Sequence, residues 1–221
     1  MGKSTRILVV VTQRVDPIGG RSEVRDSLDQ RVAEWLLDAG FYPIPVPNSL
    51  VEVDGSDGLD EGRLSDWISL VKPAAIILSG GNDIGEFPER DLTERLLLSW
   101  AQEHRVPVLG ICRGMQLMAV WAGADLTTVP GHVGTRHVLG ISDGSIANWP
   151  KSVNSFHNWA ITDCPAHFRV TARAEDGVIE AFAHMTLPWE GWMWHPEREE
   201  KFATEDTERI KRLILGKEEL K

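Results

Sequence analysis

Cys112 is the residue whose surroundings in the sequence best suit nucleophilic chemistry. It lies between Gly110 and Gly114, at the end of an apolar run from Val106 to Ile111 and before residues with helical spacing. Flanking glycines let the chain turn sharply without Cβ clashes, so the cysteine is raised at a helix N-terminus, where the helix dipole favours a thiolate. The pattern predicts a nucleophile elbow. The alternative is a buried cysteine beside a turn.

A thiolate nucleophile needs a base, and the base needs a group that orients it. His195 and Glu197 lie two residues apart, after a strand that we expect from Gly191 to Trp194. In an extended segment, residues i and i+2 face the same side. Glu197 should therefore accept a hydrogen bond from Nδ1 of His195 and leave Nε2 for the cysteine. The alternative is a surface turn.

The oxyanion that forms on an attacked carbonyl needs donors. Gly80 and Gly81 follow an expected strand and can bring a backbone N–H close to a ligand, and the N–H of Arg113 follows the nucleophile. Glycine pairs after strands also form simple turns.

Alternating strands and helices must position these groups. Apolar runs predict strands at 7–11, 41–46, 74–78 and 106–111, and helical spacing predicts helices at 28–39, 64–71, 91–100 and 113–121, the third opened by a capping box of Asp91 and Glu94. The second half is less periodic, with short strands expected at 168–174, 178–183 and 191–194 and a last helix through Ile210 and Ile214. The pattern predicts one α/β domain over residues 1–221, a doubly wound, mostly parallel sheet with helices on both faces.

The amino-acid composition disfavours several classes of binding partner. A net charge of -10 over 221 residues opposes binding to nucleic acid or to an anionic membrane. Two cysteines form no disulfide framework, and the apolar run at 7–11 is too short for a signal sequence, so we expect a reduced, cytoplasmic protein. The seven histidines lack a metal-ligand spacing. We expect no cofactor and no metal: His132 and His137 could be ligands, but exposed loop histidines are the more frequent case.

Four motifs together resemble the class I glutamine amidotransferase superfamily, with its flavodoxin-like fold, and more closely its free-standing γ-glutamyl hydrolase branch. They are Ser79-Gly80-Gly81, Gly110-x-Cys112-x-Gly114-x-Gln116, Asn154-Ser155-Phe156-His157 and His195-Pro196-Glu197. The resemblance implies that Cys112 attacks a γ-glutamyl carbonyl, that a glutamyl thioester forms, and that water releases glutamate. It implies His195 as acid and base, Glu197 as its orienting group, and Gly81 and Arg113 as oxyanion donors.

The same resemblance implies residues that bind a γ-glutamyl small molecule. Gln116 would reach the glutamyl α-carboxylate or α-amino group, Asp83 would face the α-ammonium, and Glu180 would lie near the substrate. The segment Asn154, Ser155 and Phe156 would hold the α-carboxylate. The alternatives are a glutamine facing solvent, an Asn-Asp turn, a glutamate paired with a core arginine, and a polar loop.

Several runs resemble a subgroup that hydrolyses γ-glutamyl-CDP-amidate, a nucleotidyl phosphoramidate, in capsule polysaccharide modification; they are 12–14, 80–83, 154–158 and 194–199. Arg14, Arg113 and Arg136 are then candidates for holding the phosphates, or else they form structural salt bridges.

The alternatives to this function are a γ-glutamyl-γ-aminobutyrate hydrolase and a glutaminase subunit that supplies ammonia to a separate synthetase partner. The sequence leaves open whether the chain forms a homodimer. Trp189, Trp192 and Trp194 either wall a substrate cleft or pack in the core.

Overall fold

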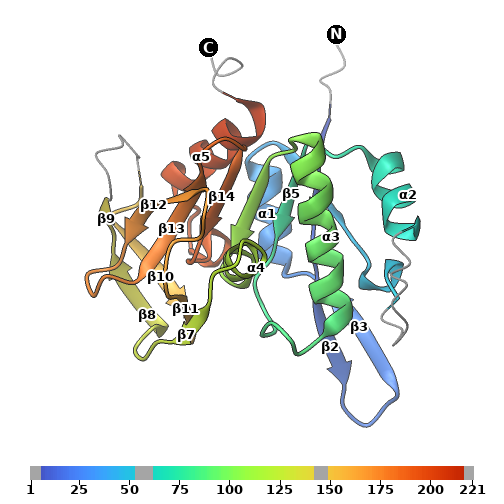
Figure 1. The fold of residues 1–221 in the computed structure, drawn as a ribbon, viewed down its shortest axis with the longest axis horizontal. Coiled ribbons are helices and arrows are strands. Elements are labelled where there is room, and N and C mark those ends of the chain that lie inside the picture. The colour runs from blue at the N-terminus through green and yellow to red at the C-terminus, as the bar shows by residue number, and fades with distance from the viewer. Residues whose placement is uncertain (1–5, 53–61, 142–148, 217–221) are drawn as a thin grey trace.

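The structure is a computed structural model that describes residues 6–52, 62–141 and 149–216. Its centre is an eight-stranded sheet of order β4-β1-β5-β6-β14-β13-β12-β9 (Figure 1). The strands are β4 (Phe41–Pro45), β1 (Ile7–Val11), β5 (Ala75–Leu78), β6 (Val108–Ile111), β14 (Trp189–Trp192), β13 (Ile179–His184), β12 (Phe168–Arg173) and β9 (Gly140–Ile141). Neighbours from β4 to β14 pair in parallel, and those from β14 to β9 pair antiparallel.

Helices cover both faces of this sheet, because alternate residues of the buried strands feed two separate cores. Val10 and Ile76 pack with α2 (Gly62–Val71), α3 (Pro88–His104) and α4 (Arg113–Trp121). Val9 and Ile77 pack on the other side with α1 (Gln30–Asp38) and α5 (Thr204–Leu215). The predicted doubly wound, mostly parallel α/β fold is confirmed. None of the described helices is long and apolar enough to cross a membrane.

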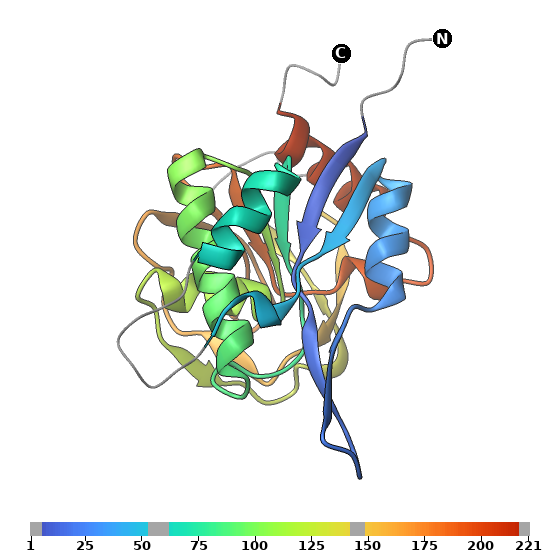
Figure 2. The same ribbon diagram turned by 90° about the vertical axis from the view of Figure 1, so that its right-hand side faces the viewer.

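Small two-stranded sheets surround the main one, and the sequence did not predict them. They pair β2 (Arg14–Ile18) with β3 (Glu23–Ser27), β8 (Val133–Val138) with β10 (Ser152–Phe156), and β7 (Leu126–Thr128) with β11 (Trp159–Ile161). The first projects away from the body of the molecule (Figure 2). These strands are short or alternate irregularly between apolar and polar residues, so they show no clear period-two pattern.

The structure corrects two expectations about local structure and decides a third point that the sequence left open. Helix α3 begins at Pro88, so Asp91 and Glu94 form no capping box; both carboxylates bind Arg113 instead. Strand β14 ends at Trp192, and a 3₁₀ turn, η2 (Pro196–Arg198), follows His195; a second such turn is η1 (Asn48–Leu50). The three tryptophans pack in the core, each at most 1% exposed, and none walls a cleft; they are Trp189, Trp192 and Trp194.

Candidate active site

The predicted chemical groups meet at one edge of the sheet because their strands are parallel neighbours. Strands β5, β6 and β14 lie side by side. The turn that begins at Ser79 follows β5, Cys112 follows β6, and His195 comes three residues after β14. The carboxyl ends of parallel strands share one edge, where open α/β sheets usually bind ligands. Topology thus joins residues that are far apart in the sequence.

Cys112 lies on a strained turn. Its φ is +51° and its ψ is -105°, and it occupies the N-cap of α4. A Cβ on Gly114 would lie 2.1 Å from the carbonyl oxygen of Leu78, and one on Gly110 would lie 2.6 Å from the backbone of Gly114. Both glycines are therefore required for α4 to pack directly against β5 and β6. A strained, buried cysteine at a helix N-terminus is the geometry expected of a nucleophile elbow.

His195 and Glu197 form a close pair inside the protein. Nδ1 of His195 lies 2.6 Å from Oε1 of Glu197, and both side chains are at most 3% exposed. The two residues that pair are those predicted. The contact forms within the η2 turn, however, and not along the extended strand that we expected. Burial lowers the pKa of His195, but the charge of Glu197 and hydrogen bonds to Cys112 and Glu197 outweigh it and raise the pKa to about 9.

Residues of β10 hold this histidine in place. The side-chain amide of Asn154 forms hydrogen bonds with both the N–H and the carbonyl oxygen of His195. The ring of Phe156 lies edge-on to the imidazole, 5.9 Å between centroids. Asn154 is buried, whereas the ring of Phe156 is partly exposed to solvent beside the histidine.

The glycine turn after β5 lies directly against the imidazole. A Cβ on Gly80 would be 2.6 Å from Cε1 of His195, so only glycine fits this approach. The buried guanidinium of Arg90 fixes the turn from beneath by donating to the carbonyl oxygens of Ser79, at 2.8 Å, and of Gly80, at 2.9 Å. Gly81 follows with φ +91°, a conformation natural to glycine.

A buried ion network links this turn to the elbow. Glu94 accepts from Arg90 at 3.0 Å and also binds the guanidinium of Arg113, which contacts Asp91 as well. Burial raises the pKa of Glu94, but the charges of Arg113 and Arg90 outweigh it and hold that pKa below its usual range.

Sequence reasoning missed Arg90 and Glu94 as residues that support the site. The signal was present, because positions 90, 94, 97 and 101 share one helical face and Leu97 and Ala101 are core residues. Two opposite charges on an apolar face of a helix indicate a buried pair.

A pocket of about 270 Å³ lies beside α4 and includes Gln116, Asp83 and Trp159 in its lining. Gln116 is buried, so it does not face solvent, and its Nε2 donates to the Trp159 carbonyl oxygen at 3.0 Å. The Trp159 indole N–H donates to Asp83 at 3.2 Å. The pocket therefore contains one amide and one carboxylate from the predicted substrate-binding set.

Other predicted substrate residues lie elsewhere. The buried Ser155 hydroxyl donates to the carbonyl oxygen of His132. Glu180 lies beside His132 and His157, so its nearest polar neighbours are histidines and not a core arginine. His132 is buried, which corrects its expected exposure, and His137 is half buried.

The three candidate phosphate-binding arginines have different surroundings. Arg113 is buried and paired with Asp91 and Glu94, so its side chain forms a structural ion pair and is not available to phosphate. Arg136 is exposed and binds Glu199. Arg14 is also exposed, pairs with Asp16, and lines a small pocket that includes His195 and Gly80.

Comparison with known proteins agrees with this geometry. The family model described as Peptidase C26 matches residues 71–197, more than half of the chain. The chain belongs to the Peptidase C26 family. The family acts on amide bonds as γ-glutamyl hydrolases, which confirms that the chain is of an enzyme family of the class I glutamine amidotransferase type.

Two curated relatives of this C26 chain illustrate the range of the similarity. It is 36% identical over 131 residues to the γ-glutamyl-CDP-amidate hydrolase of Campylobacter jejuni, an alignment covering 57% of the chain and 62% of that protein. It is 27% identical over 206 residues to the γ-glutamyl-γ-aminobutyrate hydrolase of Escherichia coli O157:H7, covering 80% of the chain and 81% of the relative.

Two solved structures support the fold. A Thermoplasma acidophilum protein related to GMP synthase superposes with a TM-score of 0.69, over 95% of this chain and 92% of its own, at 20% identity. A glutamine amidotransferase of Thermotoga maritima superposes with a TM-score of 0.60, over 87% of this chain and 76% of its own, at 16% identity. At these identities the likeness concerns the fold alone.

Proposed function

We propose that this chain hydrolyses a γ-glutamyl amide bond through Cys112, His195 and Glu197. The observation that carries the proposal is the conjunction at one sheet edge of a cysteine at φ +51° and a histidine bonded to a buried carboxylate at 2.6 Å. A thiolate at a helix N-terminus beside an imidazolium is an activated nucleophile.

The reaction would run in two halves. The sulfur of Cys112 attacks the γ-carbonyl carbon, a C–S bond forms, and the electron pair moves to the oxygen. His195 then gives its proton to the departing nitrogen as the C–N bond breaks and a glutamyl thioester forms. Water attacks the thioester, His195 takes the proton of the water, and the thiolate leaves, so that one water is consumed and glutamate and an amine are released.

Backbone donors would stabilise the oxyanion. The N–H of Gly81 belongs to the glycine turn, and the N–H of Arg113 comes directly after the nucleophile. Arg90 and the carboxylates around Arg113 hold both segments, so the donors are oriented before the substrate arrives. Fixed donors of this kind contribute to catalysis because they need no reorganisation during reaction.

The pocket beside α4 would hold the glutamyl group. The Asp83 carboxylate suits an α-ammonium, and the buried amide of Gln116 suits either end of the amino acid headgroup. Asn154, Ser155 and Phe156 support the site from β10, where the two buried side chains bond to protein backbone and Phe156 alone presents an exposed ring.

For the leaving group, we favour a nucleotidyl phosphoramidate such as γ-glutamyl-CDP-amidate, in capsule polysaccharide modification. The relative that is named for this substrate supports the choice, together with the exposed guanidinium of Arg14 beside the His195 pocket. Arg136 is a weaker candidate since Glu199 already binds it. The γ-aminobutyrate conjugate is the second candidate, because the relative named for that activity aligns over 80% of the chain.

The test is kcat/KM of the full chain for a γ-glutamyl nucleotidyl phosphoramidate, γ-glutamyl-γ-aminobutyrate and glutamine. We expect the phosphoramidate to be hydrolysed best, with a KM that rises with salt. Arg14→Ala should lower kcat/KM for it about tenfold and leave the γ-aminobutyrate conjugate unaffected. Arg25→Ala, on the same hairpin and exposed, is the matched control.

Each outcome decides a separate part of the proposal. A preference for the γ-aminobutyrate conjugate would overturn the leaving group and keep the hydrolase. Activity on glutamine alone would favour a glutaminase that works with a separate synthetase. No glutamate release from any of the three would contradict the proposed function itself.

A further inference from the structure

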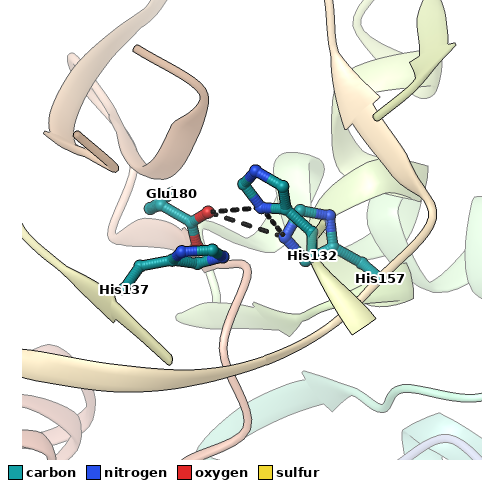
Figure 3. A group of neighbouring side chains, drawn as sticks. All are labelled: His132, His137, His157 and Glu180. Atoms are coloured by element: carbon teal, nitrogen blue, oxygen red, sulfur yellow. Dashed lines mark hydrogen bonds and ion pairs between the residues drawn. The ribbon is translucent and has the colours of Figure 1, made fainter. Parts of the chain in front are cut away.

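Four metal-ligating side chains gather outside the candidate active site (Figure 3). His132 precedes β8, His137 lies in it, His157 follows β10, and Glu180 lies in β13. One ligand atom from each lies within 4.8 Å of the others. His132, His157 and Glu180 are at most 3% exposed. Three segments distant in sequence thus deliver imidazoles and a carboxylate to one buried point.

In His132 and His157, the ring nitrogen that points away from the cluster already has a hydrogen-bond partner. Nε2 of His132 lies 2.8 Å from a carboxylate oxygen of Asp176, and Nδ1 of His157 lies 2.9 Å from the carbonyl oxygen of Trp159. A carboxylate and a carbonyl only accept, so both of these nitrogens carry hydrogen. In a neutral imidazole the second nitrogen then has a lone pair. Nδ1 of His132 and Nε2 of His157 therefore face each other, 3.2 Å apart, as two acceptors.

Glu180 adds further acceptors to the same point. Its Oε1 lies 3.6 Å from Nδ1 of His132 and 3.5 Å from Nε2 of His157, and within the described residues neither of its carboxylate oxygens has a hydrogen-bond partner. Nε2 of His137 is likewise buried without a partner. An unpaired carboxylate is costly to bury among lone pairs. A positive charge at the centre removes that cost.

We propose that His132, His137, His157 and Glu180 hold a divalent transition-metal ion, with zinc as the preferred ion. With Zn–N and Zn–O bonds of about 2.0–2.1 Å, neighbouring ligand atoms of a tetrahedral site lie about 3.4 Å apart. Three of the separations are 3.2, 3.5 and 3.6 Å. Imidazole and carboxylate ligands suit zinc. Asp176 and the Trp159 carbonyl are the outer partners that metal-bound histidines usually have.

The ion would be structural and would position the segment beside the active site. Four protein ligands close a tetrahedral shell and leave no place for substrate. The His132 carbonyl oxygen accepts from the Ser155 hydroxyl at 2.6 Å and from the N–H of His157 at 3.1 Å. The Trp159 carbonyl oxygen accepts from both His157 and Gln116. Binding would therefore fix the segment that carries Asn154 and Phe156 toward His195.

Metal content tests this proposal independently of turnover. Tag-free full-length protein, stripped with a chelator and incubated with Zn²⁺, should retain about one ion per chain when measured by mass spectrometry of the metals. Co²⁺ in its place should give the intense visible absorption of a tetrahedral site. Less than a tenth of an ion per chain, or the weak spectrum of octahedral Co²⁺, would overturn the proposal in favour of a shared proton.

Substitutions test whether the ion binds at these four residues, and an exposed position is included because buried variants can misfold. Glu180→Gln and His157→Ala should weaken Zn²⁺ binding more than about 100-fold, and His104→Ala, an exposed histidine of α3, should not change it. Because buried variants can fail to fold, Asp176→Asn is the second probe. Its side chain is 53% exposed, and losing the charge of an outer partner should weaken binding about tenfold. Equal affinity in folded Asp176→Asn, His137→Ala and the parent would contradict the assignment.

Discussion

The side-chain amide of Asn154 brackets the backbone of His195, with Oδ1 accepting from the His195 N–H at 3.0 Å and Nδ2 donating to its carbonyl oxygen at 2.7 Å. The same amide nitrogen lies 2.8 Å from Glu199, so both ends of the amide are used. This pairing couples β10 to the loop that carries the proposed acid and base through the backbone of His195.

Asn154→Ala should lower kcat/KM by about 10²-fold, because small misplacements of a catalytic group have effects of that size. The free energy of unfolding should fall by only about 1–3 kcal/mol. Asn158→Ala, an exposed position on the same segment, should leave kcat/KM unchanged. Equal activity of both variants would show that the bracket does not position His195.

Cys112 should be modified by an electrophilic glutamine analogue, and Cys164 should not. Burial raises the pKa of the Cys164 thiol, so little thiolate forms there at neutral pH. Peptide mass spectrometry should find the adduct on Cys112 only. Cys112→Ser should abolish glutamate release, while Cys164→Ser should retain it; the reverse pattern contradicts the proposed nucleophile.

His195 and Glu197 should make unequal contributions. The histidine transfers protons while the carboxylate orients it, so His195→Ala should reduce kcat by about 10⁶-fold and Glu197→Gln by about 10⁴-fold. If both variants retain nearly full turnover, the His-Pro-Glu segment is only a structural turn.

The alkaline limb of the activity profile should report His195. Its imidazolium persists until the pH approaches about 9, so the capacity to protonate the leaving nitrogen should be lost as pH rises through that value. Because the pKa is raised from 6.5 in the folded state, the associated stability is complete below pH 6.5 and is lost through about pH 9. Glu197→Gln should move the limb toward lower pH, and an unmoved limb would exclude Glu197 as the cause.

Glu94→Gln should destabilise the fold by about 3–5 kcal/mol, because it leaves the buried guanidinium groups of Arg90 and Arg113 without their shared carboxylate. Urea unfolding measures the change, and Glu103→Gln on the exposed side of α3 is the control. A loss below about 1 kcal/mol would show that the network is not a major source of stability.

Asp206→Asn should stabilise the protein at alkaline pH. Burial raises the pKa of Asp206 to about 7 despite a hydrogen bond from Trp194, so its ionisation above that pH opposes folding. Asparagine keeps an acceptor for the indole N–H and removes the charge. We expect a gain of about 1–3 kcal/mol at pH 8.5 and a clearly smaller gain at pH 5, because the penalty begins above the ordinary pKa of 3.8 and is complete only above about pH 7; equal effects at both values would contradict this explanation.

The sequence by itself determined the parallel core and the elbow, because both depend on local chemistry. Buried strands appear as uninterrupted aliphatic runs, and a cysteine between two glycines admits few backbone geometries. The pairing of His195 with Glu197 was also foreseeable from their separation, although the turn that produces it was not. Family membership followed from the same motifs.

Tertiary structure alone decided which distant polar groups share a buried site. Arg90 and Glu94 acquire their roles from Arg113 on another helix, and the histidines around Glu180 come from segments whose sequences carry no common spacing. Such contacts depend on strand order and on how the small hairpins pack. The free energy of burying a charge is set by neighbours in space, and a single sequence records neighbours only along the chain.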